Sequence, residues 1–110
     1  MEISISGEVY NLNLDKIKSL FNNNLNVSVK HKSTEEIYVE NDFYFLDIYD
    51  NSDYMKNTFL IGGILNGEFN DAVALVNKMS ELFFKENVAF ELNANKEDKN
   101  YLIKHQLENI

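Results

Sequence analysis

Hydrophobic and polar residues alternate at the start of the chain. Ile3, Ile5 and Val9 occupy every second position, and polar residues stand between them. A period of two is typical of a β-strand with one buried face and one wet face. We therefore predict a strand over residues 2–10.

A short amphipathic helix is predicted next. Asn13 is a suitable N-cap, because its side-chain oxygen can accept a hydrogen bond from a free amide of the first turn. From residue 14 to about residue 22, apolar residues recur at steps of three and four, as on one face of a helix. These residues are Leu14, Ile17, Leu20 and Phe21.

The middle of the chain shows further strand patterns. Residues 26–31 alternate, turn at Ser33-Thr34 and lead into residues 37–39, which predicts a hairpin. Residues 43–49 carry apolar side chains at both odd and even positions, so both faces of a strand here would be partly apolar. We therefore expect this strand to lie inside the sheet. Polar residues 50–53 are expected to form a turn.

The stretch from Thr58 to Leu92 predicts a strand, a turn, a long helix and a second strand. Gly62-Gly63 lies inside the apolar strand and is expected to mark a bulge or a close approach of the helix. Asn70 is the expected N-cap of a helix from Asp71 to about Glu86. We expect its core-facing stripe to be Ala72, Leu75, Val76, Met79, Leu82 and Phe83.

The end of the chain is predicted to form a short helix. Asp98 is the expected cap, and the helix is expected to run from Lys99 to about Glu108. Leu102, Ile103 and Leu107 would dock it on the body of the protein.

The order of these elements predicts the α+β class. Strands on either side of each main helix should run parallel through a crossover, and those flanking the long helix should be neighbours. We expect a ferredoxin-like sandwich with a mixed or antiparallel sheet of four to six strands, two main helices on one face and the short C-terminal helix. Such a fold does not by itself define a function.

Composition limits the class of protein. A chain of 110 residues with 45% hydrophobic residues suits a single domain over residues 1–110. It has no Cys, so disulfides and thiolate chemistry are excluded, and a cytoplasmic location is favoured. Its longest apolar runs are far below the roughly 20 residues that span a bilayer, and its start lacks a leader pattern.

The net charge of −8 is concentrated in one segment. Residues 33–55 contain seven acids and no Lys or Arg, together with several Tyr and Phe. A field of one sign repels nucleic acid and anionic membranes and attracts a basic protein partner. This segment is therefore either a docking surface, in which exposed Tyr would take part, or a solvated face with core aromatics behind it. The candidate partner-binding residues are Glu35, Glu36, Glu40, Asp42, Asp47, Tyr49, Asp50, Asp53 and Tyr54.

Candidate chemistry is sparse. Asp47, Asp50 and Asp53 are spaced by three and do not match the ligand spacing of a calcium-binding EF-hand loop, so we interpret them as a turn and a solvated strand end. His31 and His105 are far apart in the sequence and belong to no motif. Neither a nucleophile elbow nor a phosphate-binding glycine loop occurs, and the chain has no Arg. We expect neither enzyme activity nor a metal or cofactor.

One stretch resembles a known class of proteins. Phe59 to Gly63, leading through Gly67-Glu68-Phe69 into the helix from Asp71 and then into residues 88–91, looks like the small acidic immunity proteins of bacterial toxin–immunity systems. The resemblance covers about a third of the chain. It implies a cytoplasmic inhibitor that covers a basic toxin domain, often a nuclease, with its acidic surface.

Two other functions stay open from the sequence. The first is a ferredoxin-like ligand-binding or regulatory domain that acts as a homo-oligomer through its sheet edges. The second is a small enzyme, which a preformed polar cavity containing His31 would favour.

Overall fold

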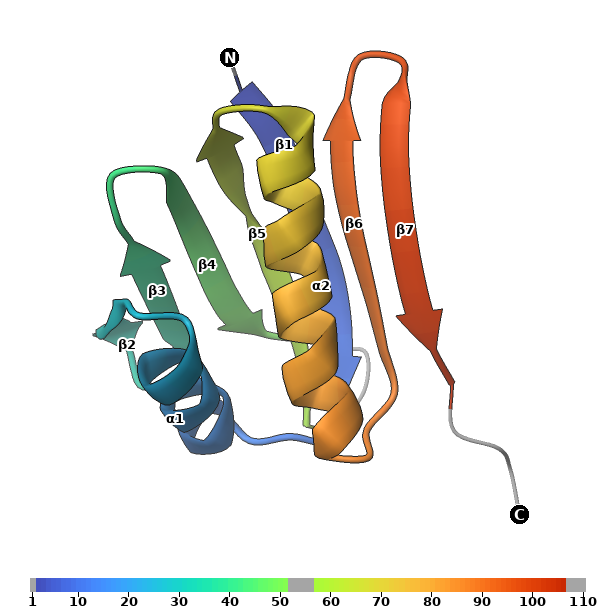
Figure 1. Cartoon of the computed structure of the whole chain (residues 1–110). Helices are drawn as coiled ribbons and strands as arrows, with labels where there is room; N and C mark the ends of the chain where they lie inside the picture. The colour runs from blue at the N-terminus through green and yellow to red at the C-terminus, as the bar shows by residue number, and fades with distance from the viewer. Residues whose placement is uncertain (1, 52–56, 107–110) are drawn as a thin grey trace.

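The computed structural model describes residues 2–51 and 57–106, and within them the chain forms one sheet and two helices. The strands pair in the order β2-β3-β4-β5-β1-β6-β7, and every neighbouring pair is antiparallel. Both helices lie on the same side of the sheet (Figure 1). The elements are β1 (Glu2–Tyr10), α1 (Leu14–Asn24), β2 (Ser28–Ser33), β3 (Glu36–Glu40), β4 (Tyr44–Asp50), β5 (Thr58–Asn66), α2 (Phe69–Lys85), β6 (Phe90–Lys96) and β7 (Lys99–His105).

The α+β class, the antiparallel sheet and the two helices on one face are confirmed, but the sheet has seven strands instead of four to six. Of the expected polar turn over residues 50–53, Asp50 ends strand β4, and residues 52 and 53 lie outside the described residues, which stop at Asn51 and resume at Asn57. In the described parts of the chain, neither helix has the length and apolar character needed to cross a membrane.

The first strand is central to the sheet. β1 pairs with β5 from Glu2↔Asn66 to Tyr10↔Thr58, and its other edge pairs with β6. Because β5 and β6 are both antiparallel to β1, they run parallel to each other, as predicted for the strands flanking α2. The prediction that they are neighbours was wrong, because β1 lies between them. β1 and β2 also run in the same direction, with β5, β4 and β3 between them.

The core lies between the sheet and the two helices. α2 packs over β1, β6 and β7, whereas α1 packs over β2 and β3. The ring centroid of Phe83 on α2 lies 6.0 Å from that of Phe21 on α1 and 5.9 Å from that of Phe90 on β6. These contacts join both helices to the sheet. The predicted stripe on α2 is confirmed, since Ala72, Leu75, Val76, Met79, Leu82 and Phe83 are all buried.

The two helix starts differ in how well local sequence predicted them. The Asn13 side chain accepts a hydrogen bond from Lys16 N at 2.8 Å, which confirms the cap of α1. The predicted Asn70 cap was wrong, because α2 begins at Phe69 with Glu68 as its N-cap. Asp71 accepts a hydrogen bond from Glu68 N at 3.0 Å, so its carboxylate satisfies a free amide at the helix start.

The predicted C-terminal helix was wrong: residues 99–105 form strand β7. β6 and β7 pair from Phe90↔His105 to Lys96↔Lys99 around a tight turn in which Glu97 has φ 49°. Tyr101 and Ile103 pack against the core on the helix side, while Leu102 points the other way. The turn lacks the Gly that usually signals a two-residue hairpin, so the local sequence gave no indication of it.

Gly62 and Gly63 lie in regular strand pairing and form no bulge. A Cβ on Gly63 would stand 1.9 Å from the backbone oxygen of Phe45, so the close approach that requires glycine is to strand β4 and not to a helix. A Cβ on Gly62 would meet no atom within 4 Å.

Candidate partner-binding face

The side of the sheet that faces away from both helices is an extended surface, which we call the open face. Alternate residues of each strand point to this side. On β1 these are Glu2, Ser4, Ser6 and Glu8, and on the other strands they are the residues that pair with them across the sheet. In the described chain, its charged and large side chains are Glu2, Glu8, Lys30, Lys32, Glu36, Tyr38, Glu40, Phe45, Asp47, Tyr49, Leu60, Ile64, Glu91, Leu102 and Lys104.

The open face combines negative charge with exposed apolar groups. Six carboxylates and three lysines belong to it within the described residues, which leaves a net charge of −3. Tyr49 is 40% exposed, Ile64 40% and Leu102 49%. Apolar and aromatic groups in an acidic surround are the composition expected of a surface that binds another protein.

Lys32 forms the largest charge network of this face. Its ammonium lies 3.1 Å from Asp47 Oδ1 and 3.4 Å from Glu36 Oε2. It also lies 5.8 Å from the ring centroid of Tyr38 and 5.6 Å from that of Phe45, within the range of a cation–π interaction. Lys32 therefore brings a positive charge to the acidic segment, although Lys32 itself comes just before residue 33, where that segment begins.

This network shifts the proton affinity of Lys32. The hydrogen bond that its ammonium donates to Asp47 is the main reason that its pKa is raised above the ordinary value of 10.5, and the nearby charges of Asp47 and Glu36 act in the same direction. Asp47 and Glu36 are thus engaged within the chain, which reduces the negative charge that they present to a partner.

The structure brings together four of the nine predicted partner-binding residues. Glu36, Glu40, Asp47 and Tyr49 lie on the open face. The others are at the ends of the sheet or beyond the description: Glu35 and Asp42 lie in the loops at the two ends of β3, Asp50 ends β4 at a position paired with buried Phe59, and Asp53 and Tyr54 lie outside the described residues.

A hollow of about 380 Å³ lies in the middle of the open face. Across it run two rows of paired residues from β4 to β7, one through Gly62 and Ser6 and the other through Leu60 and Glu8. Its lining includes Ser6, Glu8, Tyr49, Leu60, Gly62, Glu91, Asn93 and Leu102. We call this the open-face hollow.

Most of the lining was not identified from sequence. Glu8, Leu60, Glu91 and Leu102 come from four different strands, and only Tyr49 belongs to the predicted set. The alternation in β1 did indicate that Glu8 points away from the core. It could not indicate that β1 and β6 are neighbours, which places Glu91 opposite Glu8.

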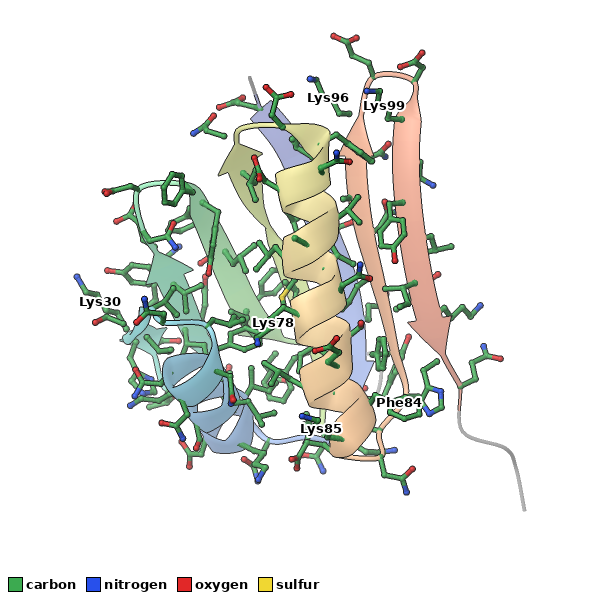
Figure 2. The ribbon with its side chains drawn as sticks, viewed as in Figure 1. Lys30, Lys78, Phe84, Lys85, Lys96 and Lys99 are labelled. Atoms are coloured by element: carbon green, nitrogen blue, oxygen red, sulfur yellow. The ribbon has the colours of Figure 1, made fainter. Side chains whose placement is uncertain are left out.

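The opposite side of the molecule carries many of the lysines. Figure 2 shows Lys78 and Lys85 on α2, and Lys96 and Lys99 at the β6–β7 hairpin, on the side that the helices cover. Phe84 is 61% exposed there, and its ring centroid lies 4.8 Å from that of His105.

The histidines lie in separate places. His31 Nε2 is 3.1 Å from Lys18 Nζ on α1, whereas His105 packs against Phe84 and Phe90. His31 does not line the open-face hollow. Across residues 2–51 and 57–106, the carboxylates and histidines form no cluster of three or more that could hold a metal ion.

Comparison with known proteins gives no relative: no family model, no curated protein and no solved structure matches the chain.

Proposed function

We propose that the protein is a small acidic binding protein of the immunity type, which neutralises a basic toxin domain by covering it with its open face. The observation that carries the proposal is the composition of this face. A seven-stranded sheet leaves one side without helices, and that side combines a net charge of −3 with exposed Tyr49, Ile64 and Leu102. Charge would accelerate encounter with a basic partner, and buried apolar contacts would slow dissociation.

The exposed apolar groups of the open face favour a protein partner over a small substrate. The lining of the hollow contains neither histidine. We therefore propose a binding function without catalysis, in the cytoplasm, where a Cys-free chain needs no disulfides.

We also propose that the fold is an elaborated ferredoxin-like sandwich. β4, β5, β1 and β6 stand in that order in the sheet, and the β5-α2-β6 unit has β1 between its two parallel strands. This is the split β-α-β arrangement of ferredoxin-like proteins. β2 and β3 would then extend one side of the sheet, and β7 the other.

A growth-rescue experiment tests the function. The product of the open reading frame next to this gene is expressed alone and together with this chain, and growth is measured. We expect the neighbouring product to be toxic and this chain to restore growth. The outcome against the proposal is a toxic neighbour whose effect this chain does not reduce, or a harmless neighbour that does not bind it.

Matched charge variants show whether the open face is responsible. Glu40→Lys with Glu91→Lys reverses two charges on the open face, and Glu81→Lys with Asp15→Lys makes the same change on the helix side. The first pair should abolish rescue and slow association at low salt, while the second should retain both. Circular dichroism would confirm that all variants are folded. Equal effects from both pairs would show that only net charge acts.

A regulatory domain that acts as a homo-oligomer is the second candidate. β2 and β7 are the edge strands of the sheet, so their outer backbone groups have no strand partner among the described residues. Pairing of β7 with a second copy would bury that edge. Sedimentation equilibrium distinguishes the two candidates, since a stable dimer at micromolar concentration favours the regulatory domain and a monomer favours the inhibitor.

A further inference from the structure

We infer that Asn66 is a site of spontaneous deamidation in the folded chain, where its side-chain amide is converted into a carboxylate. Asn66 is the last residue of β5, and Gly67 follows it in the short connection to α2. This connection lies at the end of the sheet where β1 begins (Figure 1). The inference concerns the chemistry of the chain itself and does not depend on the proposed function.

The residue that follows an asparagine controls this reaction. The backbone nitrogen of that residue must reach the side-chain carbonyl carbon of the asparagine, and a side chain on the same residue hinders the approach. Glycine has no Cβ and leaves the path open. Of the 17 asparagines in the sequence, Asn66 alone is followed by glycine.

The structure leaves the Asn66 side chain exposed and unrestrained. Both Asn66 and Gly67 are exposed, and hollows of about 280 and 240 Å³ border Asn66 on two sides. Its side chain forms no hydrogen bond with the described residues. By contrast, Asn13 Oδ1 accepts a hydrogen bond from Lys16 N, and Asn77 Oδ1 accepts one from the Tyr101 hydroxyl. Such bonds hold a side chain in place, so Asn66 is freer to turn toward the backbone of Gly67.

The reaction has two steps and needs only water as a co-reactant. The Gly67 nitrogen loses its proton to solvent base and attacks Cγ of Asn66, and the side-chain nitrogen leaves as ammonia. The product is a cyclic imide. Water then opens the ring at one of its two carbonyls, which gives either aspartate or isoaspartate, in which the main chain runs through the former side-chain carbon. Both products carry one new negative charge.

The new carboxylate would appear in an acidic part of the open face. Asn66 is directly opposite Glu2 on β1, and the smaller of its two hollows is also lined by Glu40 and Asp42. Like charges at directly opposed positions destabilise a sheet. The isoaspartate product would also lengthen the main chain at the point where Asn66 N donates a hydrogen bond to Phe43 O at 2.8 Å. Deamidation should therefore make the negative charge larger and the fold less stable.

Mass spectrometry of the aged protein tests the site. The folded chain is incubated at pH 8, samples are taken over days, and each is cleaved after lysine. One peptide, residues 57–78, contains Asn57, Asn66, Asn70 and Asn77, so fragmentation compares four asparagines in the same molecule. We expect the mass change from amide to acid several-fold faster at Asn66 than at the other three, and faster still at higher pH because the attack requires loss of a proton.

Two controls show whether the folded geometry permits the reaction. Asn66→Gln keeps the amide but would need a larger ring, so this peptide should stay unchanged over the same period. The unaltered chain in concentrated urea reports the rate of the unfolded sequence. Reaction at Asn66 in urea but not in the folded chain would overturn the inference, as would equal rates at all four asparagines of the folded chain.

The consequence for stability is tested with the carboxylate in place from the start. Asn66→Asp should lower the urea midpoint at low salt, and added salt should reduce the difference because it screens the repulsion from Glu2. Asn70→Asp introduces the same charge in the first turn of α2, where the helix dipole favours it, and should not lower the midpoint. Equal midpoints for Asn66→Asp and Asn70→Asp would contradict the expected repulsion.

Discussion

Lys32 Nζ and Asp47 Oδ1 lie 3.1 Å apart although their strands, β2 and β4, are separated by β3. The lysine side chain crosses the open face of β3 and passes over the ring of Tyr38. A register shift between His31 and Ser33 accompanies its position at the edge of the sheet. One lysine thereby connects three strands and places a positive charge inside the acidic segment.

This network predicts a specific loss of stability at alkaline pH. Because the pKa of Lys32 is raised above 10.5 in the folded chain, its contribution is complete below that pH and is lost as the pH rises through the folded pKa. Urea unfolding between pH 8 and 11 should show a smaller alkaline loss for Lys32→Met than for the unaltered chain. Lys78→Met, on the exposed side of α2, should behave like the unaltered chain. Identical pH profiles for all three would contradict the role of the network.

Tyr44 should ionise at a higher pH than a tyrosine in open solvent. Partial burial against the core raises its pKa above the ordinary value of 10.0. Ultraviolet absorbance at high pH reports tyrosinate formation, and Tyr44→Phe should remove a component that appears above the ordinary pKa of 10.0. Removal of a component at or below pH 10.0 would show that burial does not shield Tyr44. Its ionisation also adds to alkaline unfolding, because the unfolded chain loses this proton at a lower pH.

Neighbouring phenylalanines on α2 provide a matched test of the core. Phe83 is fully buried between Phe21 and Phe90, whereas Phe84 is 61% exposed. Phe83→Ala should lower the free energy of unfolding by about 3–5 kcal/mol through lost burial and a cavity. Phe84→Ala should lower it by less than about 1 kcal/mol. Chemical denaturation measures both values, and similar losses would mean that the helix is rotated from the described position.

The β6–β7 hairpin can be tested at its turn. Glu97 has φ 49°, a conformation that glycine adopts without strain. Glu97→Gly should therefore raise the free energy of unfolding by about 0.5–1 kcal/mol. The same substitution at Glu40, which lies in extended β3, should lower it by a similar amount. Destabilisation by Glu97→Gly would contradict the described turn.

The open face could be predicted only in part. Glu36, Glu40, Asp47 and Tyr49 were identified because they are close in sequence and carry an unusual combination of charge and aromatic rings. Glu8 and Glu91, by contrast, lie 83 positions apart in the sequence. Only the pairing of β1 with β6 places them opposite each other. No local pattern contains that information, since pairing depends on which strand edges are available after folding.

Sequence alone determined the elements whose periodicity is local and uninterrupted. The alternation of Ile3, Ile5 and Val9 defined β1, and the Asn13 cap with the following apolar spacing defined α1. The stripe on α2 was equally clear, because side chains three and four residues apart share a helix face whatever the rest of the chain does. The start of α2 was less clear, since Asn70 and Glu68 both offer capping groups.

Tertiary structure decided the order of the strands, the conformation of the last segment and the composition of the open face. Residues 99–105 are compatible with a helix by local spacing, but pairing with β6 satisfies their backbone groups and buries Tyr101 and Ile103 on the helix side. The Tyr101 hydroxyl then donates a hydrogen bond to Asn77 Oδ1 on α2 at 2.6 Å. Local preference was overridden because these contacts, between residues distant in sequence, exist only when β7 forms the edge of the sheet.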